Sequence, residues 1–444
     1  MSEFVVTGAL LVDGREERSA SLRVADGRIL EVLPPDAPVA ELGCEVIDGR
    51  GRWLIPGGLD PHVHFALPVG DQVTADDFAS GSRAALAGGT TTVIDFVTPA
   101  RGQSLVAATE ARLAETASAN CDVLLHGSVT SWHDHAADDL RDAVSRFGLR
   151  SLKLYLAYLE TIGLDDADLL AAMEVAAELD LTVLLHCEVG SEVTRGQQAL
   201  LAAGETAPSA HPRSRPPAVE AAAVTRALEL AARAGCRPYV VHVSCRESVA
   251  VIEAARARGQ EVLAETCPQY LWLDDTVYDG DFASAARAVI SPPLRSDEQL
   301  TALGVAVTTG AFDTLATDHC AFTDEQKARG RDDFTRIPGG AAGVQHRLSL
   351  THTLLVASRL MTPSAWVRLV SQRAAEIFGL FPRKGSLDVG ADADLVLWDP
   401  RWQGVIRGED DLHPGSVSVF EGAEVWGRAE RVWRRGRLVQ VGSY

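Results

Sequence analysis

Pro56-Gly57-Gly58-Leu59-Asp60-Pro61-His62-Val63-His64-Phe65 is the stretch from which the fold is predicted. The apolar run Trp53-Leu54-Ile55 leads into it, and Pro-Gly-Gly interrupts that run. In an extended segment, residues i and i+2 point to the same side. His62 and His64 can therefore offer two imidazole nitrogens to one metal ion. The motif alone fits a surface turn with two unrelated histidines equally well.

The middle of the chain alternates between strand-like and helical patterns. Apolar strand-like runs lie at 53–55, 91–96, 123–128, 152–158, 182–186, 239–243, 262–266 and 314–317. Stretches with helical period separate most of them, as at 76–87, 167–179, 217–234 and 246–258. This alternation predicts an α/β fold, a (β/α)8 TIM barrel over 52–384. A doubly wound open sheet is the competing fold, but no Gly-x-Gly-x-x-Gly follows the first strand.

The two ends of the chain share a different pattern of short strands and glycine-containing turns. Strand-like segments lie at 4–6, 9–12, 21–24, 29–32, 394–398, 417–420, 431–433 and 438–441. Either end is too short to form a stable domain alone. We therefore predict that 1–51 and 385–444 together form one small β-sandwich domain, with the barrel inserted between them.

Composition limits the partners and the compartment. A net charge of −20 and a pI near 5.0 argue against nucleic acid or an anionic membrane as a partner. The N-terminus has no basic, apolar leader pattern, and no stretch of 18 apolar residues occurs. Seven scattered cysteines without a CxxC pair are typical of a reducing environment. We expect a cytoplasmic protein.

Polar side chains stand at the ends of several predicted strands. Besides His62 and His64, the fourth strand carries Lys153, the fifth and sixth end at His186 and His242, and the eighth ends at Asp318. In a barrel all these strand ends meet at one mouth. Considered alone, His186 or His242 would fit a buried core position equally well. Burying the Lys153 ammonium is costly unless it is paired or neutralised, and carboxylation by CO2 would neutralise it. Three nearby cysteines, which are alternative metal ligands, read better as small packing residues: Cys187, Cys245 and Cys320.

A series of motifs in order along the chain carries a family resemblance. They are Gly57 to His64, Asp76-Asp77-Phe78, Gly88-Gly89-Thr90-Thr91, Lys153 to Tyr158, Arg215-Pro216-Pro217, Glu265 to Leu271, Ser291-Pro292-Pro293-Leu294-Arg295, Thr317-Asp318-His319-Cys320, Asp332-Asp333-Phe334-Thr335, Lys384-Gly385 and Gly390 to Leu395. Over nearly its whole length the chain resembles the dihydropyrimidinase and hydantoinase branch of the cyclic amidohydrolases.

The resemblance implies a site with two divalent metal ions, zinc in most members and manganese as an alternative. His62, His64 and Asp318 would hold one ion, and His186 and His242 the other. Carboxylated Lys153 and a hydroxide would bridge the two ions, which generate hydroxide at neutral pH. Asp318 would move a proton from the attacking oxygen to the leaving nitrogen. Tyr158 would donate to the developing oxyanion.

The resemblance also implies a substrate, a neutral cyclic ureide or imide that is opened to an N-carbamoyl amino acid. Backbone groups near Ser291 and Gly339 would form hydrogen bonds with the NH and C=O groups of the substrate ring. The family usually has Asn where this chain has Gly339, and an acidic residue where it has His346, which bears on substrate preference. Ala66 stands where dihydroorotases place an arginine for an acidic substrate. We expect the ring substituent to contact four side chains: Phe65, Leu67, Tyr155 and Ile162.

Two other functions fit the resemblance. One is an allantoinase or another cyclic-amide hydrolase. The other is a non-catalytic assembly or signalling homologue, which the complete set of six ligand positions disfavours. Most relatives form homotetramers or dimers, so we expect a homo-oligomer.

Overall fold

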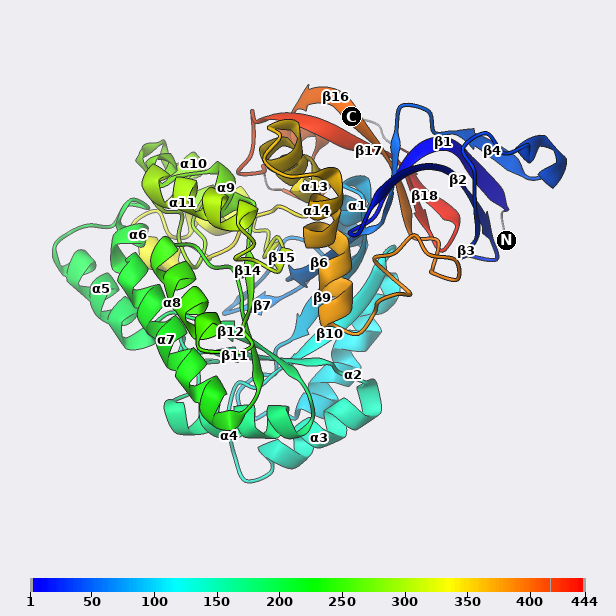
Figure 1. The fold of residues 1–444 in the computed structure, drawn as a ribbon. Helices are drawn as coiled ribbons and strands as arrows, with labels where there is room; N and C mark the ends of the chain where they lie inside the picture. The colour runs from blue at the N-terminus through cyan, green and yellow to red at the C-terminus, as the bar shows by residue number, and fades with distance from the viewer. Residues whose placement is uncertain (1–2, 416, 442–444) are drawn as a thin grey trace.

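Eight parallel strands build a barrel in the computed structural model, which describes residues 3–415 and 417–441 (Figure 1). Each strand pairs in parallel with the next in chain order. Their side chains are buried on both faces, as in a sheet covered by helices. The strands are β6 (Gly58–Val63), β9 (Thr90–Val97), β10 (Asp122–Ser128), β11 (Ser151–Tyr155), β12 (Thr182–His186), β13 (Arg237–Val240), β14 (Leu263–Thr266) and β15 (Thr314–Leu315).

Contacts between the first strand and the segment after the last strand bring the two edges of this sheet together. Val63 forms a parallel bridge with His319, and the His64 amide donates to the His319 carbonyl at 2.7 Å. The Thr317 hydroxyl donates to the buried Asp60 carboxylate at 2.6 Å. The carboxyl ends of all eight strands therefore face one mouth.

Helices form the outer layer of the barrel (Figure 1). The longer ones are α1 (Phe78–Ala87), α2 (Leu105–Glu115), α3 (Ala136–Phe147), α4 (Asp166–Glu178), α5 (Gly190–Ala202), α7 (Pro217–Ala234), α8 (Arg246–Ala257) and α11 (Asp297–Thr308). Local signals set their ends: Asp77 and Asp165 cap α1 and α4 through their side chains, and left-handed Gly235 ends α7. The predicted barrel is confirmed, with helix bounds close to those expected.

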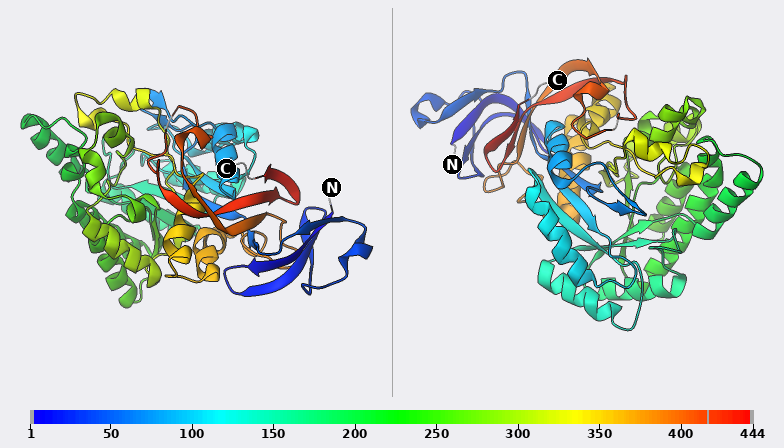
Figure 2. Two further views of the ribbon diagram at one scale, coloured as in Figure 1. Left: turned by 90° about the horizontal axis from the view of Figure 1, so that it is seen from above. Right: turned by 180° about the vertical axis from the view of Figure 1, so that it is seen from behind.

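The two ends of the chain form a second sheet beside the barrel (Figures 1 and 2). Its strand order is β18-β17-β16-β5-β1-β2-β3, and β4 also pairs with β1. Apolar side chains from both ends fill its core, among them Phe4, Leu22, Leu395 and Trp433. The strands are β1 (Phe4–Val12), β2 (Glu17–Ala25), β3 (Arg28–Leu33), β4 (Glu45–Asp48), β5 (Trp53–Pro56), β16 (Leu395–Val405), β17 (Glu424–Arg434) and β18 (Arg437–Val441).

Two strand predictions were wrong. The run at 53–55 was taken as the first barrel strand, but β5 pairs with β1 and β16 of the end sheet. The barrel begins after Gly57, where a Cβ atom would lie 2.0 Å from the Thr91 hydroxyl oxygen. Residues 417–420 form no strand: 417–418 are irregular and 419–420 lie in a turn. The Asp411 carboxylate accepts from the Ser418 amide, and the Ser418 hydroxyl accepts from the Phe420 amide.

A buried ion-pair cluster joins the two bodies. The Lys384 ammonium lies 2.5 Å from carboxylate oxygens of both Asp122, at the start of β10, and Asp394, next to β16. The acidic group of Asp122, Asp392 and Asp394 thus already surrounds a cation. Among the described residues, every helix falls short of the length and apolar character that a membrane crossing requires.

Candidate metal centre and active site

The end of β6 and the segment after β15 bring the first three predicted ligands together at the barrel mouth. His62 and His64 lie at the end of β6, and Asp318 lies beyond β15. The Nε2 atoms of both histidines are 3.2 Å from the same oxygen of Asp318. Burial alone would raise the pKa of Asp318, but His62, His64 and Lys153 lower it to about 2. The three side chains therefore offer two nitrogens and a carboxylate oxygen to one cation.

Glu265 fixes the ring of His62, and the sequence did not single it out as a functional residue. This buried carboxylate on β14 lies 2.7 Å from Nδ1 of His62 and also accepts from the His242 amide and the Tyr239 hydroxyl. Burial holds the pKa of His62 well below its usual value, so the ring is neutral. With the proton on Nδ1, the lone pair of Nε2 faces Asp318.

His186 and His242 form a second pair. Nδ1 of His186 is 2.9 Å from Nε2 of His242, and the Glu188 carboxylate is 3.1 Å from Nε2 of His186. Burial lowers the pKa of both rings. Since Glu188 fixes the His186 proton on Nε2, its Nδ1 lone pair faces the second imidazole, an arrangement that suits a shared cation. Within the described residues, no third histidine, cysteine or carboxylate completes this pair.

Lys153 lies among the four histidines. It is buried on β11, with Nζ 5.2 Å from the centre of the Phe96 ring and 5.4 Å from that of Tyr155. Its charge acts electrostatically on His62, His186 and His242. Burial lowers the pKa of Lys153 to about 8, which favours the neutral amine that reacts with CO2. A carboxylate formed there would add the oxygen ligands that the second pair lacks.

Strained backbone aims several of these side chains. His242, Asp318 and Tyr158 have φ values of 39°, 51° and 60°, in the left-handed region that non-glycine residues seldom adopt. Ala66, just after the first two histidines, is also left-handed at 45°. Such strain persists only where the surrounding structure enforces it, and it collects at functional sites. Here the left-handed residues follow four different barrel strands, and three of them line the same cavity.

A cavity of about 620 Å³ opens above the candidate ligands. Tyr158 is 37% exposed within it, and its hydroxyl interacts with Ser291 and with Arg215. Although the residue as a whole is partly exposed, its hydroxyl end is enclosed, and this burial is the main cause that raises the pKa of Tyr158, so the hydroxyl keeps its proton. All six ligand positions line the cavity, and so do most of the residues predicted to contact substrate: Leu67, Tyr155, Tyr158, Ile162, Ser291 and Gly339.

Phe65 was predicted to line this cavity, and it does not. Its ring is fully buried behind the ligands, 5.9 Å from the centre of the Phe78 ring and 5.4 Å from that of His319. Alternation along the segment explains this, because His64 points into the mouth and its neighbour must point away. Leu67 reaches the cavity because left-handed Ala66 breaks the alternation.

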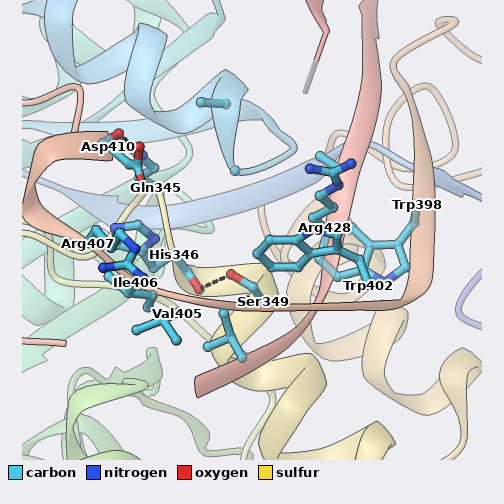
Figure 3. Close-up of a pocket in the computed structure, with 15 residues that line it drawn as sticks. Gln345, His346, Ser349, Trp398, Trp402, Val405, Ile406, Arg407, Asp410 and Arg428 are labelled. Atoms are coloured by element: carbon cyan, nitrogen blue, oxygen red, sulfur yellow. Dashed lines mark hydrogen bonds between the residues drawn. The ribbon is translucent and has the colours of Figure 1, made fainter. Parts of the chain in front are cut away.

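His346, which departs from the family pattern, lies at a different cavity (Figure 3). Its Nε2 atom is 2.7 Å from the Asp411 carboxylate, and Trp402 and Arg428 line the same space of about 430 Å³. It is absent from the lining of the barrel mouth. His346 therefore does not line the substrate cavity, so its difference from the family pattern cannot act on the substrate by direct contact, contrary to our expectation.

Gly339 does line the cavity at the barrel mouth, beside Ser291. Its φ is not left-handed, and a Cβ atom placed on it would meet only the Ser291 hydroxyl oxygen, at 3.4 Å. The backbone therefore does not require glycine there. Gly340 differs, because its φ is 155° and a Cβ atom would lie 2.4 Å from the Cys320 carbonyl oxygen. Glycine at 339 enlarges the cavity beside Ser291.

Arg215 and His211 also line the cavity, although the sequence did not mark them as site residues. The Arg215 guanidinium is 2.5 Å from the Glu188 carboxylate, so its charge is paired. The motif Arg215-Pro216-Pro217 was the sequence signal from which Arg215 could have been identified as a site residue. Burial raises the pKa of Cys187, Cys245 and Cys320, so these cysteines remain thiols and fit the packing role expected of them.

Comparison with known proteins places the chain in a family. The amidohydrolase family profile matches residues 53–439. The chain belongs to the amidohydrolase family. This amidohydrolase is 38% identical over 441 residues to a D-hydantoinase of Geobacillus stearothermophilus, covering 99% of this chain and 93% of the relative. It is 37% identical over 443 residues to dihydropyrimidinase 2 of Caenorhabditis elegans, covering 99% and 85%.

Solved structures agree with the sequence relatives. A dihydropyrimidinase from Brevibacillus agri superposes with a TM-score of 0.96 at 35% identity, covering 98% of this amidohydrolase and 95% of that chain. Both the barrel and the end sheet lie within this match. The resemblance inferred from the motifs is thus confirmed over the full length.

Proposed function

We propose that this amidohydrolase opens the ring of a neutral cyclic ureide or imide, namely a dihydropyrimidine or a 5-substituted hydantoin, and releases an N-carbamoyl amino acid. One observation carries the proposal. Two groups of candidate metal ligands, His62–His64–Asp318 and His186–His242, line one cavity that is also lined by Tyr158 and by backbone near Ser291 and Gly339. Relatives named for hydrolysis of both ring types support it.

The donor set fits two divalent ions, most simply zinc, with manganese as the alternative. Neutral imidazoles, a carboxylate and a carboxylated Lys153 are ligands that both ions accept. When bound, such ions polarise a carbonyl group and make hydroxide available at neutral pH. Ion loading is tested by metal analysis. In the Lys153→Ala variant we expect loss of both bound metal and activity, and full activity in that variant would refute the bridging role.

The chain's own residues supply proton transfer and charge stabilisation. Asp318, with a pKa near 2, is ionised and can accept the proton of the attacking water. As the ring carbon–nitrogen bond breaks, Asp318 delivers that proton to the leaving nitrogen. Tyr158 projects into the cavity with its proton retained and donates to the carbonyl oxygen as negative charge develops there.

Support for a neutral ring comes from the charge of the buried arginine in the described cavity lining, which is already paired; Arg329 and Arg336, which also line the cavity, are exposed. Arg215 is that buried arginine, and Glu188 neutralises it. The test is turnover of dihydrouracil, a 5-substituted hydantoin, allantoin and dihydroorotate by protein reconstituted with zinc or manganese and bicarbonate. We expect one of the first two to give the highest kcat/KM. If dihydroorotate is the best substrate, the assignment is wrong.

Assembly of identical subunits is a further part of the proposal. The sequence resemblance led us to expect a homotetramer or dimer, because most relatives form one. Sedimentation equilibrium at several protein concentrations measures the mass against the 47.3 kDa of one chain. A single species of that mass would refute the expectation.

A further inference from the structure

The chain contains only three lysines among its 41 basic residues, and all three are buried. Lys153 lies in the candidate metal centre, and Lys384 pairs with carboxylates where the barrel meets the end sheet. Lys327, on the short helix α12 (Asp324–Ala328), has neither role. A buried ammonium destabilises the folded protein unless it is compensated. The hydrogen-bond partners of Lys327 should therefore indicate its structural role.

Lys327 donates to three backbone carbonyls. Nζ lies 2.9 Å from the Val289 oxygen, 2.8 Å from the Pro338 oxygen and 2.7 Å from the Gly340 oxygen. Burial lowers the pKa of Lys327 to about 7, but three carbonyl oxygens around Nζ are all acceptors and favour the protonated form, whose three N–H donors this arrangement uses. The carbonyls come from two separate segments, 288–294 and 337–340. Their residues Ser291, Pro338, Gly339 and Gly340 line the cavity of the barrel mouth.

Other side chains hold the first segment in the same way. The Tyr278 hydroxyl donates to the Ala288 carbonyl at 3.0 Å, Nε2 of His211 donates to Ile290 at 2.7 Å, and the Tyr270 hydroxyl donates to Pro292 at 2.7 Å. The carbonyl of Ser291 is left without a donor among the described residues. It is therefore available to a ligand in the cavity. The amide of Gly339, which lies between the two carbonyls that Lys327 binds in the second segment, is also available, whereas the Gly339 carbonyl accepts from the Cys320 thiol.

We infer that Lys327 is a positioning residue. Its three hydrogen bonds, which we call the clasp, hold the segments 288–294 and 337–340, the two backbone walls of the substrate cavity, and thereby set the affinity for the substrate ring. The inference rests on the proposed function. The two walls are also joined by the Gly340 amide, which donates to Val289 at 2.9 Å. Because Gly339 and Gly340 carry no side chains to pack, and glycine loses the most conformational freedom on ordering, the second wall depends strongly on the clasp.

The test compares Lys327→Met with Lys384→Met. Both replace a buried ammonium by an apolar chain of similar length, but only the first touches the cavity walls. For Lys327→Met we expect KM to rise about tenfold or more while kcat falls less than about threefold, since ring contacts are shared by the ground state and the transition state. Bound metal should stay unchanged. For Lys384→Met, KM should equal that of the wild type, even though the variant is less stable.

Hydrogen exchange gives a readout that needs no turnover. In Lys327→Met, amides of 288–294 and 337–341 should exchange faster than in the wild type and in Lys384→Met, while the strand ends that carry the ligands keep their protection. Equal exchange of both segments would overturn the inference, and so would an unchanged KM. If the wild type turns over no cyclic amide, the proposed function fails, and the exchange result still decides whether the clasp exists.

A smaller variant guards against misfolding. Lys327→Ala removes the part of the side chain that corresponds to propylammonium and leaves a cavity of that size. Added propylammonium should restore KM toward the wild-type value, whereas tetramethylammonium, which has no N–H donor, should not. Restoration by both cations, or by neither in a folded variant, would contradict a clasp made of three hydrogen bonds.

Discussion

Replacing Glu265 should weaken metal binding without touching a ligand. Glu265→Leu removes the acceptor for Nδ1 of His62 and for the His242 amide, and both lie in the buried site. The ring of His62 then loses the partner that keeps its proton on Nδ1 and its Nε2 lone pair toward Asp318. Loss of such an outer partner typically lowers metal affinity about 10- to 100-fold, or roughly 1.4–2.7 kcal/mol.

The same change should also reduce stability. Two buried donors lose their acceptor, at about 1–3 kcal/mol each. The Tyr239 hydroxyl does not add to this, because it keeps Thr314 as a partner. Removing a carboxylate whose pKa burial has already raised to about 7 recovers part of the loss. We therefore expect unfolding of the metal-free protein to become easier by about 2–4 kcal/mol.

Glu265→Gln is the matched control. The amide oxygen can accept from His62 and His242, and the amide nitrogen can donate to Tyr239, whose own proton then goes to Thr314. Zinc affinity should fall less than about tenfold in this variant. Competition against a chromophoric chelator measures affinity, and urea unfolding measures stability. Wild-type zinc affinity in Glu265→Leu would refute the idea that this carboxylate orients His62.

Three further predictions follow from single side chains. Tyr158→Phe should lower kcat about 100-fold with unchanged metal content, as loss of an oxyanion donor does, and equal kcat would exclude that role. Gly339→Asn narrows the space beside Ser291, so steady-state kinetics should show the kcat/KM ratio of dihydrouracil to a bulky 5-substituted hydantoin rising about tenfold; an unchanged ratio would contradict this. Burial lowers the pKa of His352 to about 4 in the folded state, so its neutral form stabilises the protein above pH 6.5, and that contribution is lost as pH falls toward 4. Between these values the metal-free wild type should lose about 3 kcal/mol more than His352→Asn in urea unfolding, and parallel pH curves would contradict the shift.

The barrel and the ligand set were predictable because their signals are local. Apolar runs, helical periods and capping residues each act within a few positions, and the barrel topology then forces the strand ends together. The run at 53–55 failed because a buried strand has the same composition in either sheet. Its membership depends on pairing with β1 and β16, and β16 lies more than 300 residues away.

Residues that act through other residues were harder to find. Glu265 sits inside an apolar strand pattern, and only the folded barrel shows that it faces His62. Lys327 follows Asp324-Glu325-Gln326, a polar stretch that looks like an exposed helix, yet its ammonium is enclosed by carbonyls. The one sequence signal for Lys327 is the rarity of lysine in a chain that otherwise uses arginine. Phe65 was a different error, since strand alternation alone already excluded it.

The cavity separates two kinds of recognition. The ring would meet backbone groups held by buried donors, and these contacts survive changes of side chain such as glycine at position 339. The substituent would instead meet side chains near the entrance, including Leu67 and Ile162. Substitutions at the entrance can therefore alter which substituent is accepted while the ring chemistry persists. A change at Lys327 should do the opposite, weakening every ring alike and leaving the order of preference among substituents intact, because the clasp touches only the wall that all substrates share.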